Sequence, residues 1–297
     1  MLNRIKRLID NPWGIGAFAV LFIGSAVSYV LLGRFDRPES TGLLLGMSGF
    51  LFIFTFVYIR FMEDVTPDKW IGFSMVIWFL GWLVENVSQR SGLLGGYYHY
   101  DYAKLHALSL GSVPLLVPTI WLLFSLLVGS ISHYLNDRPE FMNKERQVRF
   151  LSWKYFERSL ISGGLMLSID FAIEWHFSSV AGFWKWRIET GPSLDGIPIG
   201  NFILWFGVGF LIPTLEKGTG VPARNFLRED RFLRALPALG LCVLLGAGGI
   251  MNLFYGFLIG AGLCVFSLSM ILGFVLKVGL TDMKDSSIMP AKKCSET

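Results

Sequence analysis

The chain has 297 residues, of which 53% are hydrophobic and 16% charged, and its mean hydropathy is +0.53. Because soluble domains carry about 25% charged residues, this composition excludes an ordinary soluble protein and indicates an integral membrane protein. The formal net charge of +4 comes from short segments between apolar runs, so it indicates membrane topology and no nucleic-acid partner.

Eight apolar runs are long enough to cross a bilayer, which requires about 20 residues per helix. They predict an all-α, polytopic bundle of about eight transmembrane helices, at residues 13–33, 41–62, 70–87, 108–132, 156–177, 196–215, 234–254 and 257–277. The first run lacks a small-residue cleavage site, so we expect a retained span and no signal peptide. A turn near Tyr255 and Gly256 separates the last two runs, which predicts a tight helical hairpin.

The Lys and Arg residues predict the orientation of these helices. With the N-terminus inside, most of the 26 basic residues fall on the cytoplasmic side, as the positive-inside rule requires. We therefore expect a protein of the cell membrane with both termini in the cytoplasm. The Gly-rich and aromatic segments 88–107 and 178–195 then face outward, where they suit loops that cap a cavity. Residues 1–281 are expected to form one domain, and the polar tail 282–297 is expected to be disordered.

Two carboxylates, Asp170 and Glu174, lie within a predicted span. They are four residues apart, so on a helix they share one face and differ by about 6 Å in height. An ionisable side chain in a span costs roughly 2.5–3.5 kcal/mol and usually marks a pathway or a reactive site. The alternative is a structural role, in which the carboxylates pair with Lys185, Arg187 or a hydroxyl group of a neighbouring helix.

The predicted topology brings further polar residues to the same outer layer as the two carboxylates. Glu85 ends one outward-running span, and Asn201 begins an inward-running one. We therefore expect the carboxylates, Glu85, Asn201 and the nearby Tyr98 to line one cavity.

The chain offers few groups for a metal ion or a nucleotide cofactor. Its three cysteines, Cys242, Cys264 and Cys294, show no paired spacing, and its four histidines form no HxxxH or HxxHH pair. There is no GxGxxG, P-loop or GxSxG motif. We therefore expect free thiols, no metal site and no cofactor.

Several motifs carry a resemblance to a known family. They are SGLLGGYYHYD at 91–101, GSVPLLVPTIW at 111–121, the Asp170-x-x-x-Glu174 pair, Trp184-x-Trp186, and GIPIGNFILW at 196–205. In this order they resemble the membrane carotenoid-biosynthesis family that contains the hydratases of γ-carotene and bisanhydrobacterioruberin. The sequence departs from the family pattern at Leu94-Gly95, where the family has Pro-Phe, and at Trp175, where it has Pro.

The resemblance implies that water adds across the terminal double bond of an acyclic carotenoid ψ end, giving a tertiary alcohol without a redox cofactor. Such a reaction needs an acid, one positioned water and aromatic faces for a carbocation. Asp170 or Glu174 is the candidate acid, because a second carboxylate nearby helps one of the pair to stay protonated. Asn201, His99 or Glu85 are the alternatives for holding the water. The candidate substrate-binding residues are aromatic: Tyr98, Tyr100, Trp121, Trp184, Trp186 and Trp205.

Other functions stay open at this point. A carotenoid cyclase would use the same protonation, but a neighbouring double bond would capture the cation. A carotenoid-binding or transport protein would need no acid, although a transporter would be expected to show internal repeats, and none is evident. The expected partners are an acyclic carotenoid, water and the lipid bilayer, and the sequence does not indicate an oligomeric state.

Overall fold

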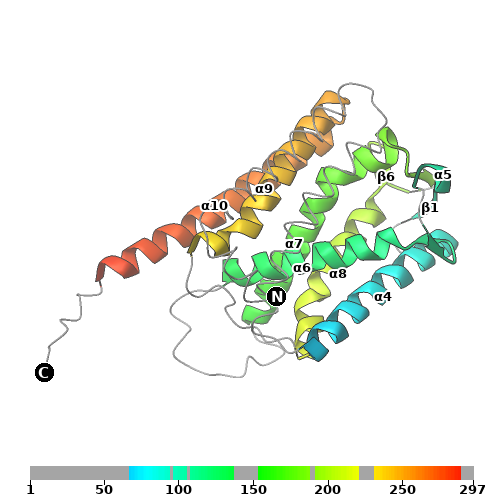
Figure 1. The fold of residues 1–297 in the computed structure, drawn as a ribbon. Helices are drawn as coiled ribbons and strands as arrows, with labels where there is room; N and C mark the ends of the chain where they lie inside the picture. Colours follow the sequence, from blue (N-terminus) through cyan, green and yellow to red (C-terminus); the bar gives the residue numbers. More distant parts are fainter. Residues whose placement is uncertain are drawn as a thin grey trace, which may run out of the picture.

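The computed structural model describes residues 67–93, 96–105, 108–136, 153–187, 191–220 and 231–288, so the predicted spans 13–33 and 41–62 lie outside it. The described part is a bundle of long helices with short strands gathered at one end (Figure 1). Its long helices are α4 (Pro67–Ser91), α6 (Leu116–Asn136), α7 (Trp153–Trp175), α8 (Ile199–Gly218), α9 (Arg231–Phe254) and α10 (Leu258–Ile288).

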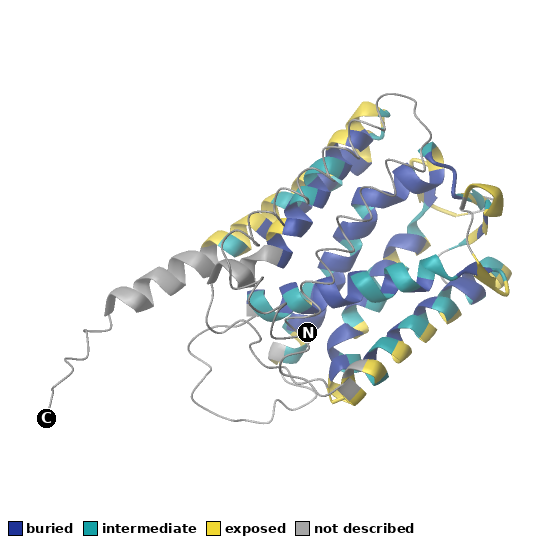
Figure 2. Cartoon of the chain, in the orientation of Figure 1, coloured by how far each residue is buried: buried dark blue, intermediate teal, exposed yellow. Residues whose placement is uncertain are grey.

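Five of these helices, α4, α6, α8, α9 and α10, are long and apolar enough to cross a membrane. The structure thus confirms an all-α integral membrane protein, whereas the count of eight spans stays a prediction. α7 is absent from this set because it carries Arg158, Asp170 and Glu174. It packs against α6, α8, α9 and α10, and it is the most enclosed helix in Figure 2. The side chains of Arg158, Asp170 and Glu174 are buried and therefore face protein, as intramembrane charges generally do.

Two of the predicted spans begin too early. The run 108–132 starts with a hairpin of β2 (Ser109–Leu110) and β3 (Val113–Pro114), and α6 follows it. The run 196–215 likewise starts inside a hairpin of β5 (Ser193–Leu194) and β6 (Ile197–Pro198), ahead of α8. Both hairpins contain apolar residues and a proline, so hydropathy alone does not separate them from the helix that follows.

The C-terminal pair of helices forms the predicted tight hairpin. α9 ends at Phe254, α10 begins at Leu258, and Gly256 adopts a φ of +83° in the turn between them. α10 continues to Ile288, so it includes residues 282–288 of the predicted tail, and the disorder of the tail stays a prediction. The rest of the predicted tail lies outside the described residues.

A small sheet joins the two predicted outer loops. β1 (Tyr97–Tyr100) pairs antiparallel with β4 (Trp184–Arg187), so that Tyr98 lies opposite Trp186. The short helix α5 (Tyr102–Leu105) follows β1, and a π-helix, η2 (His176–Val180), leads from α7 toward β4. The segments 88–107 and 178–195 are therefore partly ordered by pairing with each other.

Glycines let the helices approach α7 closely. A Cβ atom on Gly209 of α8 would lie 2.7 Å from the backbone oxygen of Ser162. On Gly248 of α9 it would lie 2.5 Å from the backbone oxygen of Ala172. Small residues at such crossings allow close backbone packing between membrane helices. The position of α7, and of its carboxylates, is fixed by these contacts.

Candidate functional site

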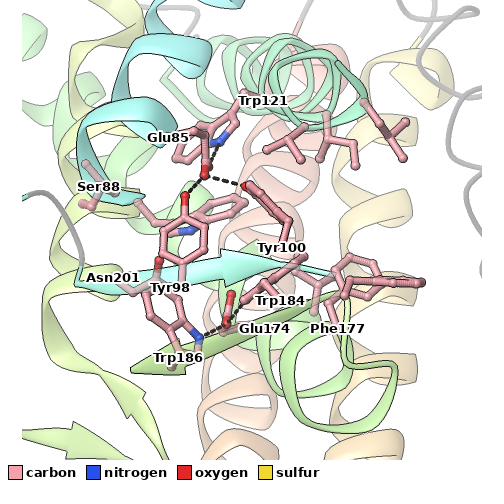
Figure 3. A pocket seen from close by; sticks show the side chains of 17 residues that line it. Glu85, Ser88, Tyr98, Tyr100, Trp121, Glu174, Phe177, Trp184, Trp186 and Asn201 are labelled. Carbon is pink, nitrogen blue, oxygen red and sulfur yellow. Dashed lines mark hydrogen bonds between the residues drawn. The ribbon is translucent and has the colours of Figure 1, made fainter. Parts of the chain in front are cut away.

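A pocket that is partly open to the outside lies where α4, α6, α7 and α8 meet the β1–β4 sheet (Figure 3). Its walls are mostly apolar and aromatic, as is usual for sites that bind small molecules. The side chains that line it include Glu85, Ser88, Tyr98, Tyr100, Trp121, Glu174, Phe177, Phe183, Trp184, Trp186, Asn201 and Trp205.

Glu85 occupies one wall of the pocket and accepts three hydrogen bonds. The Tyr98 hydroxyl donates to its Oε2, the Tyr100 hydroxyl donates to the same oxygen over 2.7 Å, and Trp121 Nε1 donates to Oε1 over 2.7 Å. Burial and the nearby Glu85 carboxylate raise the pKa of Tyr98 and of Tyr100 well above the usual range, so both phenols keep their protons and donate. Three donors suit an ionised carboxylate, which only accepts hydrogen bonds.

Glu174 lies across the pocket from Glu85 (Figure 3). Its Oε1 accepts hydrogen bonds from the indole nitrogens of Trp184, over 2.9 Å, and Trp186, over 2.6 Å. These tryptophans alternate along β4 with Lys185 and Arg187, whose side chains are exposed. Two indoles of the pocket wall thus donate hydrogen bonds to the carboxyl group of Glu174.

Asp170 lies one helical turn before Glu174 and behind the pocket wall. It is fully buried, and its Oδ2 accepts a hydrogen bond of 2.8 Å from Asn201 Nδ2. Its Oδ1 has no hydrogen-bond partner among the described residues. Asp170 and Glu174 are also close enough to interact electrostatically. Asn201, which itself lines the pocket, therefore connects Asp170 to the site.

Aromatic rings surround the space between the two glutamates. Trp121 stacks on Trp205 with 4.4 Å between ring centroids and 26° between planes. Tyr98 lies 4.9 Å from Trp186 on the sheet side. The six predicted substrate-binding residues all line this pocket: Tyr98, Tyr100, Trp121, Trp184, Trp186 and Trp205.

The structure brings most of the predicted polar residues together. Glu85, Glu174 and Asn201 line the pocket, and Asp170 contacts it through Asn201. His99 does not join them, because it lies on the exposed face of β1. The alternation of buried and exposed residues along a strand places its neighbours, and not His99, toward the pocket.

Eight lining residues were missed by the sequence reasoning, among them Ser88, Phe177 and Phe183. Ser88 follows Glu85 by three residues, which puts both on one face of a helix, so this spacing was an available signal. The two phenylalanines lie in and after the π-helix, and no sequence pattern indicated that geometry.

The described residues contain no group of three or more His, Cys, Asp or Glu side chains that could hold a metal ion. Cys242 and Cys264 are buried free thiols, and Cys294 lies outside the described residues.

Comparison with known proteins identifies a family. A family model described as "Carotenoid biosynthesis protein" matches residues 45–271, which is most of the chain and includes every pocket residue named above. No curated protein and no solved structure matches.

Proposed function

The chain belongs to the carotenoid biosynthesis protein family, and from this premise we propose that it adds water to the terminal double bond of an acyclic carotenoid end. The observation that carries this proposal is a carboxyl group, Glu174, set in an aromatic pocket opposite a second carboxylate, Glu85. Acid chemistry on an alkene requires such a water-poor, aromatic site. The double bond at the end of a carotenoid is apolar, so it suits the apolar and aromatic walls of the pocket.

In the first step, the carboxyl group of Glu174 protonates the CH carbon of the terminal double bond. The π bond breaks, a C–H bond forms, and a tertiary carbocation remains on the adjacent carbon. Faces of Trp184 and Trp186 stabilise this positive charge, each by roughly 0.5–2 kcal/mol. The Glu85 carboxylate, held by its three donors, adds a favourable negative charge.

In the second step, the oxygen of a water molecule attacks the cation and a C–O bond forms. The proton that this water releases passes to the Glu174 carboxylate, which restores the acid. Asn201 is the group that we assign to hold the water. Its amide nitrogen donates a hydrogen bond to Asp170. Its amide oxygen can therefore accept a hydrogen bond from water.

In this scheme Asp170 supports Glu174 and does not contact the substrate. It contacts Asn201 and interacts with Glu174, but it does not line the pocket. We therefore assign it a positioning role, and we assign the role of proton donor to Glu174. The expectation from the sequence left this choice open.

Expression in a lycopene-producing host, followed by mass analysis of the pigments, tests the proposal. A gain of one water supports hydration. An unchanged mass with altered absorption would instead indicate a cyclase, and unchanged pigments would contradict both activities.

Purified protein then tests the source of the hydroxyl group. Under anaerobic conditions, with a chelator and isotopically heavy water, we expect an alcohol that carries the label from water. An alcohol that forms only with oxygen, and takes its label from oxygen, would contradict the mechanism.

A further inference from the structure

A second polar cluster lies inside the bundle, at the far end of the helices from the pocket. Arg158 of α7 donates a hydrogen bond to Glu216 of α8, and His133 Nε2 of α6 lies 3.3 Å from Glu216 Oε2. The Arg158 and Glu216 side chains are buried. A Cβ atom on Gly129 would lie 2.6 Å from Glu216 Oε1, so this glycine leaves room for the carboxylate.

Three buried serines lie between this ionic cluster and the pocket. Ser125, Ser159 and Ser162 are at most 1% exposed, and their hydroxyls have no hydrogen-bond partner among the described residues. Other serines in these helices donate to the carbonyl oxygen four residues earlier, as Ser130, Ser168 and Ser269 do. The three buried serines depart from this pattern.

Two of the three serines lie on α7 and the third lies on α6. Ser159 follows Arg158 directly, and Ser162 lies one turn further along α7, at the same face as Met166 and Asp170. Ser125 of α6 lies one turn after Trp121, which lines the pocket.

Helix packing places Ser162 beside α8. The backbone of Ser162 contacts Gly209 of α8, two turns after Asn201 on that helix. Two further buried atoms of α7 have no hydrogen-bond partner among the described residues, Arg158 Nε and Asp170 Oδ1. Along α7, Ser159 and Ser162 therefore lie between the ionic cluster and Asp170, with the fully buried Met166 between Ser162 and Asp170.

A buried hydroxyl without a partner is destabilising, because it has lost its hydrogen bonds to water. Buried polar groups of this kind are commonly satisfied by internal water, which makes about three hydrogen bonds in proteins. We propose that Ser125, Ser159 and Ser162 bind a row of buried water molecules that leads from the His133–Arg158–Glu216 cluster toward the pocket. Its use as a source of reacting water rests on the proposed hydration.

Hydroxyl-radical footprinting of the full-length protein in lipid nanodiscs tests the row directly, because X-ray pulses generate radicals from bound water. Met166 is the reporter, and Met251 of α9, also buried, is the matched control. We expect Met166 to oxidise several-fold faster than Met251. Equal, slow oxidation of both methionines would overturn the proposal.

Two serine variants sharpen the test. Ser162→Ala should lower the oxidation rate of Met166 several-fold, whereas Ser168→Ala, which removes a hydroxyl bonded to Gly164, should leave it unchanged. An unchanged rate in Ser162→Ala would show that the hydroxyl binds no water.

This readout is independent of catalysis. A protein that forms no alcohol but shows the Met166 pattern would contradict the proposed hydration and leave the water row in place. An active hydratase in which Met166 oxidises no faster than Met251 would support the proposed hydration and contradict the water row.

Discussion

The side-chain amide of Asn201 donates a hydrogen bond of 2.8 Å to the carboxyl group of Asp170, which ties the first turn of α8 to α7 inside the bundle. Both residues are buried. A buried acceptor that loses its donor keeps the full cost of leaving water, so this contact stabilises the fold as well as the site.

Asn201→Ala should therefore lower the free energy of unfolding by about 1–3 kcal/mol. The matched control is Ile203→Ala, which truncates an exposed side chain of the same helix. Thermal unfolding in detergent measures both variants. Equal unfolding temperatures for the two would show that the hydrogen bond adds no stability.

Glu174→Gln should reduce the rate of alcohol formation by about 10²–10⁴-fold, because the amide keeps the shape of the side chain and removes the acidic proton. Asp195→Asn is the control, since Asp195 is exposed and its φ of +44° is tolerated by Asn. Product formed per amount of folded protein is the measurement. Near-normal turnover in Glu174→Gln would mean that this carboxyl group is structural.

Glu85→Gln should lower the rate about tenfold or more, a loss of roughly 1.4 kcal/mol in transition-state stabilisation. The amide removes the negative charge and turns an N–H group toward donors that need acceptors. Tyr98→Phe removes one of the three donors and keeps the charge, so its loss should be smaller. The two variants are compared by turnover at saturating carotene. A larger loss in Tyr98→Phe than in Glu85→Gln would contradict an electrostatic role.

Gly129→Ala should destabilise the protein by about 1–3 kcal/mol, because the new Cβ would collide with Glu216. Gly164→Ala is the matched control, since nothing lies within 4 Å of its Cβ position. It should be neutral or stabilising by up to about 1 kcal/mol, as helix propensity favours Ala. Unfolding temperatures in the same detergent compare the two. If Gly129→Ala were as stable as Gly164→Ala, the Glu216 side chain would be able to move away from the new methyl group without loss of stability.

Much of the polar layer could be predicted from the sequence, because charges are rare enough in apolar runs to stand out. The i, i+4 spacing of Asp170 and Glu174 and the alternation of spans were enough to bring Glu85 and Asn201 near them. The order of the motifs also indicated the family correctly.

The strands could not be predicted in the same way. β1 and β4 have four residues each, and their pairing depends on contacts between distant segments that no local pattern encodes. The period-two spacing of Tyr98 and Tyr100, and of Trp184 and Trp186, was a usable signal that the helix-based reasoning did not apply. For the same reason His99 was kept as a candidate for holding the water, although it lies on the exposed face of β1 between two buried tyrosines.

Because Tyr100 of β1 pairs with Trp184 of β4, the sheet beside the pocket can form only after both strands have been synthesised. A membrane protein is made from its N-terminus, so α4 and β1 leave the ribosome well before β4 exists. Until α7 has been inserted, Glu85 has no facing wall, and Asn201 arrives later still with α8. The site is therefore completed late in biosynthesis. A nascent chain that stops before α8 carries the proposed acid but has no closed chamber in which to use it.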